Sequence, residues 1–455
     1  MTNRRDFIKK SALGSAAIAI GGMELSAKSY NSIQGANDRI NIAVIGIGGQ
    51  GGTHINSFCG LKDSKNIRVR TLCDVDEKFF ENRVKTVVER TGETPKTEWD
   101  MRKVFEDKDI HAVSFATPNF WHALGTIWAC QAGKHVYVEK PASYGVFEGK
   151  KMVEAARKYN VRVQTGTQNR SITGVIEAIK FLHNGGIGDV FMAKGLCFKP
   201  RDSFGIAKDG EPPATLHYDM WLGPVQWQPY NEKRVHYNWH WHWATGGGDT
   251  ANQGPHQFDI ARWGLNKNEH PVTIYSMGGL YGINPAECSQ ETPNTQTSVF
   301  KYKDGKMLEF ETRGRYTHAE AGLGIRIGNM FYGTEGYVEI DGGTWKAYRK
   351  REEKPFAGSD VGERPTDPTF LAPPGGSNHY GNFIDAIRSG KNEDLHADIH
   401  EGYMSACLPA LANISYRVGR QLTFDGAKEK FVNDPEADKL LTREYRKGFV
   451  VPQNV

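Results

Sequence analysis

The sequence has no cysteine-rich region and no long uninterrupted hydrophobic segment. Its six cysteines lie far apart among 455 residues and form no Cys-x-x-Cys pair, which excludes a small disulfide-stapled scaffold. We expect free, mostly buried thiols. The longest apolar stretch has about half of the ~20 residues that a membrane span needs, so we expect no such span and a soluble mature chain.

The sequence also lacks a large excess of charge of either sign. Lysine and arginine total 57 against 53 aspartates and glutamates, giving a formal net charge of +4, and no basic run is present. This distribution excludes the electrostatic footprint of a nucleic-acid-binding protein. No internal repeat is evident.

The N-terminal segment has the composition of an export signal. It begins MTNRRDFIKK, with Arg4 and Arg5 as a twin arginine, followed by an apolar stretch over residues 11–20 and the small residues LSA at 25–27. The alternative is an ordinary amphipathic helix, but the segment is short, interrupted by glycine and without a cap. We therefore predict a twin-arginine signal peptide over residues 1–27 and a periplasmic location.

A glycine-rich turn follows the first predicted strand, residues 40–45. The stretch NIAVIGIGGQGG arranges Gly46, Gly48 and Gly51 as G-x-G-x-x-G before a predicted helix. Gly46 permits a tight turn, Gly48 lets the backbone approach a pyrophosphate, and Gly51 lets helix and strand pack closely. The turn predicts a dinucleotide whose phosphates bind at the helix N-terminus.

The next predicted strand, residues 67–73, ends in Asp74. Asp74 follows Gly51 at close to the ~20 residues expected for the acid that binds the ribose. A carboxylate there accepts hydrogen bonds from both ribose hydroxyls and repels a 2′-phosphate, which favours NAD over NADP. The alternative is a merely solvated aspartate at a strand end.

Strands and helices then alternate up to residue 165. Helices are predicted over 77–90, 123–132 and 146–159, and strands over 112–116, 135–139 and 162–165. This alternation predicts a doubly wound parallel sheet, a Rossmann domain over residues 38–166. Ligands of such sheets lie beyond the carboxyl ends of the strands. The candidate cofactor-binding residues are therefore Gly46, Gly48, Gly49, Gln50, Gly51, Asp74, Thr117, Pro118, Asn119, Glu139, Lys140, Gln168 and Asn169.

The second half has longer β-rich stretches separated by glycine, proline and asparagine. They cover residues 190–198, 272–279, 297–303, 307–313 and 336–340, followed by a predicted surface loop over 352–377 and helices over 380–389 and 399–419. The pattern predicts an α/β domain over 167–455 with a large, mainly antiparallel open sheet. One face of that sheet packs on helices and the other is free to join a partner.

Four motifs in the first half stand out together. They are the glycine loop, ATPN at 116–119 with Trp121 and His122, AGKHV at 132–136, and above all VEKP at 138–141. Together they resemble the glucose-fructose oxidoreductase and inositol dehydrogenase (Gfo/Idh/MocA) family.

The resemblance implies a role for each motif. Lys140 reaches the substrate hydroxyl and the nicotinamide ribose, Glu139 contacts the nicotinamide side, and His122 belongs to the cofactor site. The resemblance also implies a second α/β domain whose sheet forms an oligomer interface, and hence a homo-oligomer, a dimer or tetramer.

The chemistry of Lys140 supports this role separately. Removing a hydride from a carbinol carbon requires a positioned base for the hydroxyl proton. A partly desolvated lysine beside a positive nicotinamide has its charged form disfavoured and can act as that base near neutral pH. The alternative is a surface lysine that caps a strand end.

A predicted helix over residues 253–264 carries His256. In the family the helix start reads as aspartate, three residues, then histidine; here His256 fits, but Asn252 stands at the aspartate position. Asparagine carries no charge, so we expect Asn252 to orient the substrate while His256 or Lys140 handles the proton. Asp249 is a candidate source of the missing charge, and Asn252→Asp is expected to be tolerated. The alternative for His256 is a packed helix histidine.

The stretch HYNWHWHW, residues 236–243, alternates histidine and tryptophan. His236, His240 and His242, with Asp249, have a spacing that metal ligands can use. The interleaved tryptophans favour a carbohydrate pocket instead, and structural packing is the third reading; we predict no metal. The candidate substrate-binding residues are Arg170, Tyr218, Trp221, His240, Trp241 and Asp249.

The function predicted is NAD-dependent oxidation of a sugar or glycoside hydroxyl by an enzyme that holds its nicotinamide tightly. One alternative is a redox-neutral NAD-dependent glycoside hydrolase, which oxidises, eliminates or hydrates, and returns the hydride. The EKP tripeptide favours the dehydrogenase, whereas export favours the hydrolase. A second alternative, a non-catalytic sugar-binding protein, conflicts with the intact glycine loop and with Lys140.

Overall fold

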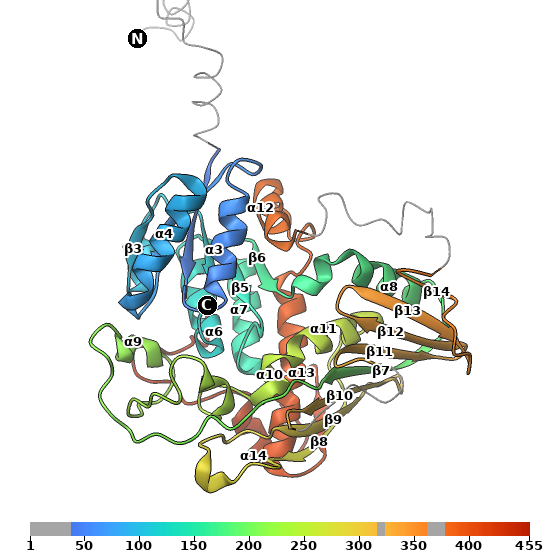
Figure 1. The fold of residues 1–455 in the computed structure, drawn as a ribbon. Helices are drawn as coiled ribbons and strands as arrows, with labels where there is room; N and C mark the ends of the chain where they lie inside the picture. Colours follow the sequence, from blue (N-terminus) through green and yellow to red (C-terminus); the bar gives the residue numbers. More distant parts are fainter. Residues whose placement is uncertain (1–37, 316–323, 362–377) are drawn as a thin grey trace, which may run out of the picture. The chain divides into compact units, whose positions relative to one another are not determined.

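The computed structural model of the chain describes residues 38–315, 324–361 and 378–455 (Figure 1). Residues 41–455 form one compact unit. The predicted signal peptide, residues 1–27, lies outside the described residues. All six cysteines are free and buried, as predicted. Within the described ranges, no helix has the length and apolarity that crossing a membrane requires.

The first half forms a six-stranded parallel sheet in the order β3-β2-β1-β4-β5-β6. The strands are β1 (Ile40–Ile45), β2 (Ile67–Cys73), β3 (Lys96–Glu98), β4 (Ala112–Phe115), β5 (His135–Glu139) and β6 (Val163–Gly166). The helices are α3 (Gly51–Gly60), η2 (Glu77–Phe79), α4 (Phe80–Thr91), α5 (Met101–Glu106), η3 (Asn119–Trp121), α6 (His122–Gln131) and α7 (Val146–Lys158). This strand order is that of a dinucleotide-binding sheet, which confirms the predicted Rossmann fold.

The second half forms a ten-stranded sheet in the order β14-β13-β12-β11-β7-β10-β9-β8-β15-β16. The strands are β7 (Val190–Cys197), β8 (Thr273–Gly279), β9 (Thr295–Lys301), β10 (Met307–Arg313), β11 (Ile327–Gly333), β12 (Gly336–Asp341), β13 (Thr344–Arg349), β14 (Ala357–Gly358), β15 (Leu422–Asp425) and β16 (Lys430–Phe431). Only the β7–β10 pair is parallel among the pairings of this sheet in the described chain. The predicted mainly antiparallel sheet is confirmed.

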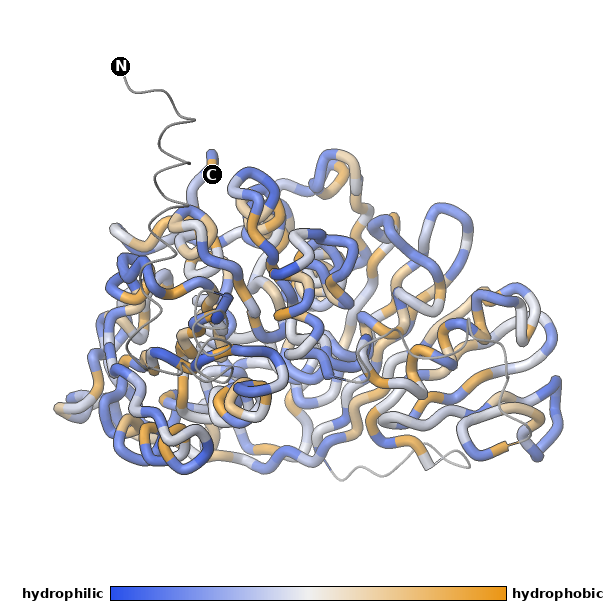
Figure 2. The backbone as a smooth tube through the Cα atoms, turned by 90° about the horizontal axis from the view of Figure 1, so that it is seen from above, coloured by the Kyte–Doolittle hydropathy of each residue, from blue (hydrophilic) through white to orange (hydrophobic). Residues whose placement is uncertain are grey.

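Helices cover one face of this sheet. The remaining helices of the described chain are η4 (Gln168–Ser171), α8 (Thr173–His183), α9 (Tyr218–Leu222), η5 (Asn238–Trp241), α10 (Gly248–Asn252), α11 (Gly254–Gly264), η6 (Pro285–Glu287), α12 (His379–Ser389), α13 (Ile399–Val418), α14 (Pro435–Asp438) and η8 (Lys439–Leu441). Alternate residues of β9 and β10 are buried, and Phe258 of α11 packs on Phe310 of β10 with ring centroids 4.5 Å apart. Figure 2 shows hydrophobic and hydrophilic residues alternating over short distances along the chain. The alternation of buried and more exposed residues along β9 and β10 is the period-2 pattern from which these strands are predicted.

Residues 198–247, which we call the connecting segment, run from β7 to α10 and contain α9 and η5 (Figure 1). Part of this segment packs into the hydrophobic cluster of the first half, through residues such as Leu216 and Trp221. The indole nitrogen of Trp121 donates to the carbonyl oxygen of Met220 at 3.0 Å. The connecting segment therefore lies against the Rossmann sheet although it follows the first strand of the second sheet in sequence.

Candidate active site

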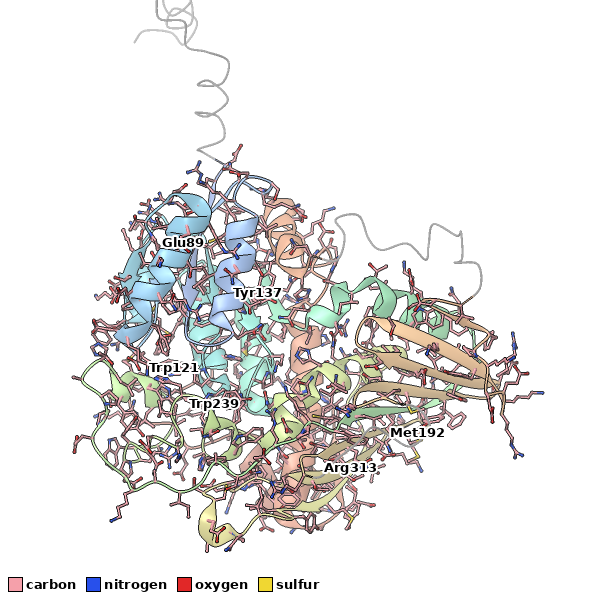
Figure 3. All side chains as sticks on the ribbon, viewed as in Figure 1. Glu89, Trp121, Tyr137, Met192, Trp239 and Arg313 are labelled. Atoms are coloured by element: carbon pink, nitrogen blue, oxygen red, sulfur yellow. The ribbon has the colours of Figure 1, made fainter. Side chains whose placement is uncertain are left out.

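One cavity of about 470 Å³ brings most of the predicted site together. It lies at the carboxyl ends of the Rossmann strands and is walled in part by the connecting segment; Figure 3 labels Trp121 and Trp239, two of its lining residues. The predicted residues in its lining are Gly46, Gly48, Gly49, Gln50, Asp74, Thr117, Pro118, Asn119, His122, Glu139, Lys140, Gln168, Trp221, His240, Asn252 and His256.

The glycine turn has the shape that a dinucleotide needs. Gly46 has φ of +82°, and a methyl group on it would lie 2.7 Å from the backbone nitrogen of Thr117. A methyl group on Gly51 would lie 1.9 Å from the carbonyl oxygen of Gly46, so the turn and the start of α3 require glycine at both positions. Gly48 lines the cavity without a side chain in the way of a ligand. The residues present therefore fit a pyrophosphate at the N-terminus of α3.

Asp74 lies at the end of β2 and faces the same cavity. Its buried carboxylate accepts hydrogen bonds from the backbone N–H groups of Ile47, at 2.7 Å, and Asp76, at 2.9 Å. Burial raises the pKa of Asp74 to about 6, against the lowering effect of these two hydrogen bonds. The carboxylate is thus fixed in place and ionised at neutral pH, as a ribose-binding acid must be.

Asp74→Asn provides a test of cofactor choice and of pH dependence. Because Asp74 loses its charge as the pH falls through about 6, the NAD affinity of the wild type is expected to fall over that range. In Asp74→Asn this pH dependence is expected to disappear, and the preference for NADH over NADPH to shrink by about tenfold, since a like charge no longer opposes the 2′-phosphate. Fluorescence titrations of nicotinamide-free protein with NADH and NADPH measure both effects.

Asp63→Asn, a change to an exposed carboxylate, is the matched control and is expected to change neither quantity. Equal affinity of the wild type for NADH and NADPH would refute the assignment of Asp74.

Glu139, at the end of β5, is a buried and fixed negative charge. Its Oε1 accepts hydrogen bonds from the side-chain amide of Gln168, at 2.8 Å, and from the ring of His54, at 3.1 Å. Burial alone would raise the pKa of Glu139, but the hydrogen bond to His54 and the nearby charge of Lys140 lower it to about 2. His54 was not predicted as a site residue, because a histidine inside α3 carries no signal in the sequence.

Lys140 joins the two halves of the site. Its ammonium group donates to the backbone carbonyl oxygen of Asn252 at 2.9 Å. Burial lowers the pKa of Lys140, while the carboxylates of Glu139 and Asp249 act in the opposite direction. A lysine whose charged form is disfavoured in this way is suited to accept a proton.

His256, in the first turn of α11, lines the same cavity as Lys140. Burial, reinforced by the charge of Lys140, lowers the pKa of His256 to about 3, so the imidazole is neutral at pH 7. Its Nδ1 atom is buried and has no hydrogen-bond partner within the described part of the chain.

Comparison with known proteins agrees with this geometry. Residues 40–167 match the family described as "Oxidoreductase family, NAD-binding Rossmann fold", and residues 206–317 and 363–451 match its "C-terminal alpha/beta domain". The chain belongs to the Gfo/Idh/MocA oxidoreductase family. The resemblance carried by the sequence motifs is confirmed, and NAD is the cofactor that this fold binds.

Two named relatives share shorter stretches. Levoglucosan dehydrogenase from Pseudarthrobacter phenanthrenivorans is 36% identical over 96 residues, covering 21% of this chain and 25% of that protein. A glycosyl hydrolase family 109 protein from Shewanella pealeana is 27% identical over 172 residues, covering 34% of this chain and 37% of that protein. The chain thus matches only about a quarter to a third of the length of these relatives.

Solved structures share the fold. Aldose-aldose oxidoreductase from Caulobacter crescentus, complexed with glycerol, superposes with a TM-score of 0.62 at 19% identity, covering 85% of this chain and 100% of that one. Levoglucosan dehydrogenase in complex with NADH and levoglucosan has the same TM-score at 18% identity and the same coverage.

Asn252, which stands at the family's aspartate position in this Gfo/Idh/MocA protein, contacts a buried ion pair. The guanidinium group of Arg201 donates to both oxygens of Asp249 at 2.9 Å, and the side-chain amide of Asn252 donates to Oδ1 of Asp249 at 3.3 Å. Asp249 itself is buried outside the cavity lining. Its charge is therefore held by Arg201, a residue that the sequence pattern did not identify.

Five other predicted residues lie outside this cavity. Arg170 is buried and forms a two-bond ion pair with Asp259, at 2.8 and 3.0 Å. Tyr218 donates to backbone carbonyl oxygens of the connecting segment, and Trp241 is buried beside the guanidinium group of Arg201. Asn169 lines a different cavity. Gly51 is also absent from the lining, since it lies below the turn at the start of α3.

The three histidines of the HYNWHWHW stretch point to different partners. His236 contacts Asp76 at 2.8 Å, His242 contacts Glu291 at 3.3 Å, and His240 stacks on Trp239 with ring centroids 3.6 Å apart. No group of three potential metal ligands occurs among the residues that the structure places. The histidines whose spacing in the sequence is compatible with a metal site therefore do not lie together in the structure.

The connecting segment also binds the start of η2, just after β2, through a set of contacts that we call the clasp: Thr215, His217 and His236 against Asp76 and Glu77. The hydroxyl of Thr215 donates to Asp76 at 2.7 Å, and His236 contacts the other oxygen at 2.8 Å. His217 contacts Glu77 at 2.8 Å, and the backbones pair through Glu77 N–H to the Thr215 carbonyl. The clasp was missed because its two sides lie far apart in sequence.

Proposed function

We propose that this protein is an NAD-dependent oxidoreductase that acts on a hydroxyl group of a sugar or glycoside and retains its nicotinamide between turnovers. One observation carries the proposal: Lys140 and His256 line the same cavity as the glycine turn and Asp74. The aromatic wall formed by Trp221, Trp239 and His240 suits the apolar C–H faces of a sugar ring. The levoglucosan dehydrogenase relative supports the substrate class.

The residues divide the chemistry as follows. Bound NAD supplies the acceptor for a hydride from the carbinol carbon. Lys140, with its lowered pKa, takes the hydroxyl proton at Nζ. His256 is neutral and orients the reacting hydroxyl through a ring nitrogen, and Asn252 holds the lysine through its backbone carbonyl. Glu139 stays ionised and fixed beside them.

Incubating the folded protein with a panel of free sugars and glycosides tests the proposal. We expect at least one to change the nicotinamide absorbance and yield a ketosugar.

The glycosyl hydrolase family 109 relatives make a redox-neutral hydrolase the second candidate. Release of the aglycone without a lasting absorbance change would identify the hydrolase; no product of either kind would refute both.

We also propose that the protein is exported through the twin-arginine route. The support is the leader itself, in which Arg4 and Arg5 precede an apolar stretch and a small-residue site. Replacing both arginines by lysine is expected to keep the protein in the cytoplasm, which cell fractionation would show. Unchanged export would refute this route.

A homo-oligomer formed through the second sheet is part of the same proposal. The sheet face opposite the helices carries exposed apolar side chains, with Tyr275 42%, Met277 59% and Met307 37% exposed; Figure 3 labels Met192 and Arg313 on strands of this sheet. Met277→Arg is expected to halve the mass measured by light scattering, since a buried unpaired charge disfavours association. Met277→Leu is the matched control. A monomeric wild type would refute the proposal.

A further inference from the structure

A second cavity, of about 200 Å³, shares His256 with the first. It lies where η4 and α11 meet the β11–β12 hairpin. Four amide side chains line it, those of Asn169, Gln253, Gln257 and Asn329, and isoleucines of α11, β11 and β12 complete the wall. No charged side chain is among the described residues of its lining.

Two polar atoms at this cavity have no partner. Asn329 is fully buried; its amide nitrogen donates to the backbone carbonyl oxygen of Gln257 at 2.8 Å, but its Oδ1 has no partner in the described structure. The same holds for Nδ1 of His256. Buried polar atoms are nearly always hydrogen-bonded. Because His256 borders both cavities, the unpaired Oδ1 of Asn329 is the atom that indicates a polar ligand in the second cavity.

The lining selects the class of that ligand. With no charged group, the cavity offers nothing to balance a phosphate, a carboxylate or a metal ion. Its volume of about 200 Å³ far exceeds the roughly 15 Å³ that one water requires. Amides offer both donors and acceptors, and the isoleucines offer an apolar surface. This combination matches a neutral ring that carries hydroxyl groups.

We propose that this second cavity binds a non-reacting sugar ring, so that the preferred substrate is a two-ring glycoside whose oxidised ring lies in the first cavity. The inference rests on the proposed function. His256 is the link, because one imidazole borders both cavities: it faces the reacting hydroxyl on one side and the attached ring on the other.

The test compares one-ring and two-ring substrates: methyl β-glucoside with cellobiose, and methyl α-glucoside with maltose. We expect the wild type to have a kcat/KM about tenfold higher for one disaccharide than for its methyl glucoside. Asn329→Leu is expected to lower kcat/KM for the disaccharide by more than for the methyl glucoside and so to remove most of that preference. Asn329→Ala, which opens the cavity instead of filling it, is expected to act in the same direction. Met330→Leu, on the opposite face of β11, is the control.

Saturation-transfer NMR provides a readout other than turnover. In the wild type both rings of the disaccharide are expected to receive saturation, and in Asn329→Leu only the reacting ring. Equal kcat/KM for one-ring and two-ring sugars, or an equal loss for both in Asn329→Leu, would overturn the inference alone. Absence of any nicotinamide absorbance change with every sugar, including a transient change in a single turnover, would overturn the proposed function and the inference with it.

Discussion

Lys140→Ala is expected to leave nicotinamide bound and to lower turnover by about 10²–10⁴-fold, the usual contribution of a general acid or base. Lys140 has no contact with the glycine turn or Asp74 among its hydrogen bonds in the structure; its ammonium group binds the carbonyl oxygen of Asn252. The substitution therefore removes the proton acceptor and leaves the phosphate and ribose sites intact. Single-turnover kinetics with saturating sugar measure the loss.

The pH profile separates chemistry from positioning. Burial lowers the pKa of Lys140 from its ordinary value of 10.5, and the neutral amine is the active form. In the wild type kcat is therefore expected to rise with pH, with a midpoint below that of a free lysine, and in Lys140→Ala this rise is expected to be absent. Lys85→Ala, an exposed lysine on α4 outside the cavity lining, is the control and should retain both activity and the pH profile. A loss confined to KM would show that Lys140 only positions the substrate.

The structure reverses one expectation for Asn252. From the sequence, Asn252→Asp restores the family pattern and is expected to be tolerated. However, the side-chain amide of Asn252 donates to Asp249 at 3.3 Å, and an aspartate there would place two carboxylates in contact. Arg201 already donates one hydrogen bond to each carboxylate oxygen of Asp249. We therefore now expect Asn252→Asp to reduce turnover.

The sequence predicts well those features of the fold and site that depend on neighbouring residues in the chain. The glycine turn, Asp74 and the residues after β4 and β5 follow from where strands end, because a parallel sheet brings all its carboxyl ends to one edge. The strands β9 and β10 follow from alternation. By contrast β3 is only three residues long and lies largely exposed, and β11, IGNMFYG, contains two glycines, so neither has a strong pattern.

Side chains whose partners are distant in sequence were harder to assign. Arg170 was predicted in the substrate site, but Asp259 binds it in the interior. Asp249 was predicted there too, and Arg201 holds it outside the lining. A charged residue near a strand end or in a loop has the same appearance in sequence whether it faces a ligand or a buried partner. Only the tertiary pairing separates the two cases.

The second large effect concerns cofactor retention. The protein is expected to purify with nicotinamide in near-stoichiometric amount and to complete its cycle without added NAD. If the protein is exported as proposed, it has no ordinary NAD pool outside the cytoplasm. Because the twin-arginine route carries folded proteins, we then expect the cofactor to be captured before export. Such an enzyme must reoxidise its cofactor in place, by returning the hydride to the same sugar or by passing it to a second carbonyl compound.

We expect the clasp to slow the release of nicotinamide. His236 lines the cavity and contacts Asp76, whose backbone N–H in turn binds Asp74. Moving His236 away from the cavity therefore requires breaking its part-buried hydrogen bond to Asp76. Asp76→Ala leaves His236 and Thr215 without their acceptor. We expect it to raise the rate of nicotinamide release by about 10- to 100-fold, because differences between related complexes lie mostly in the off-rate.

A chase of bound NADH with excess NAD, followed by fluorescence, measures this rate, and Glu81→Ala, an exposed change on α4, is the control. An equal release rate in Asp76→Ala and wild type would show that the clasp does not retain the cofactor. Cofactor that washes out of the wild type on desalting, with activity strictly proportional to added NAD, would refute retention altogether. It would also weaken the proposal of export, because an enzyme that exchanges its cofactor freely needs a compartment with a nicotinamide supply.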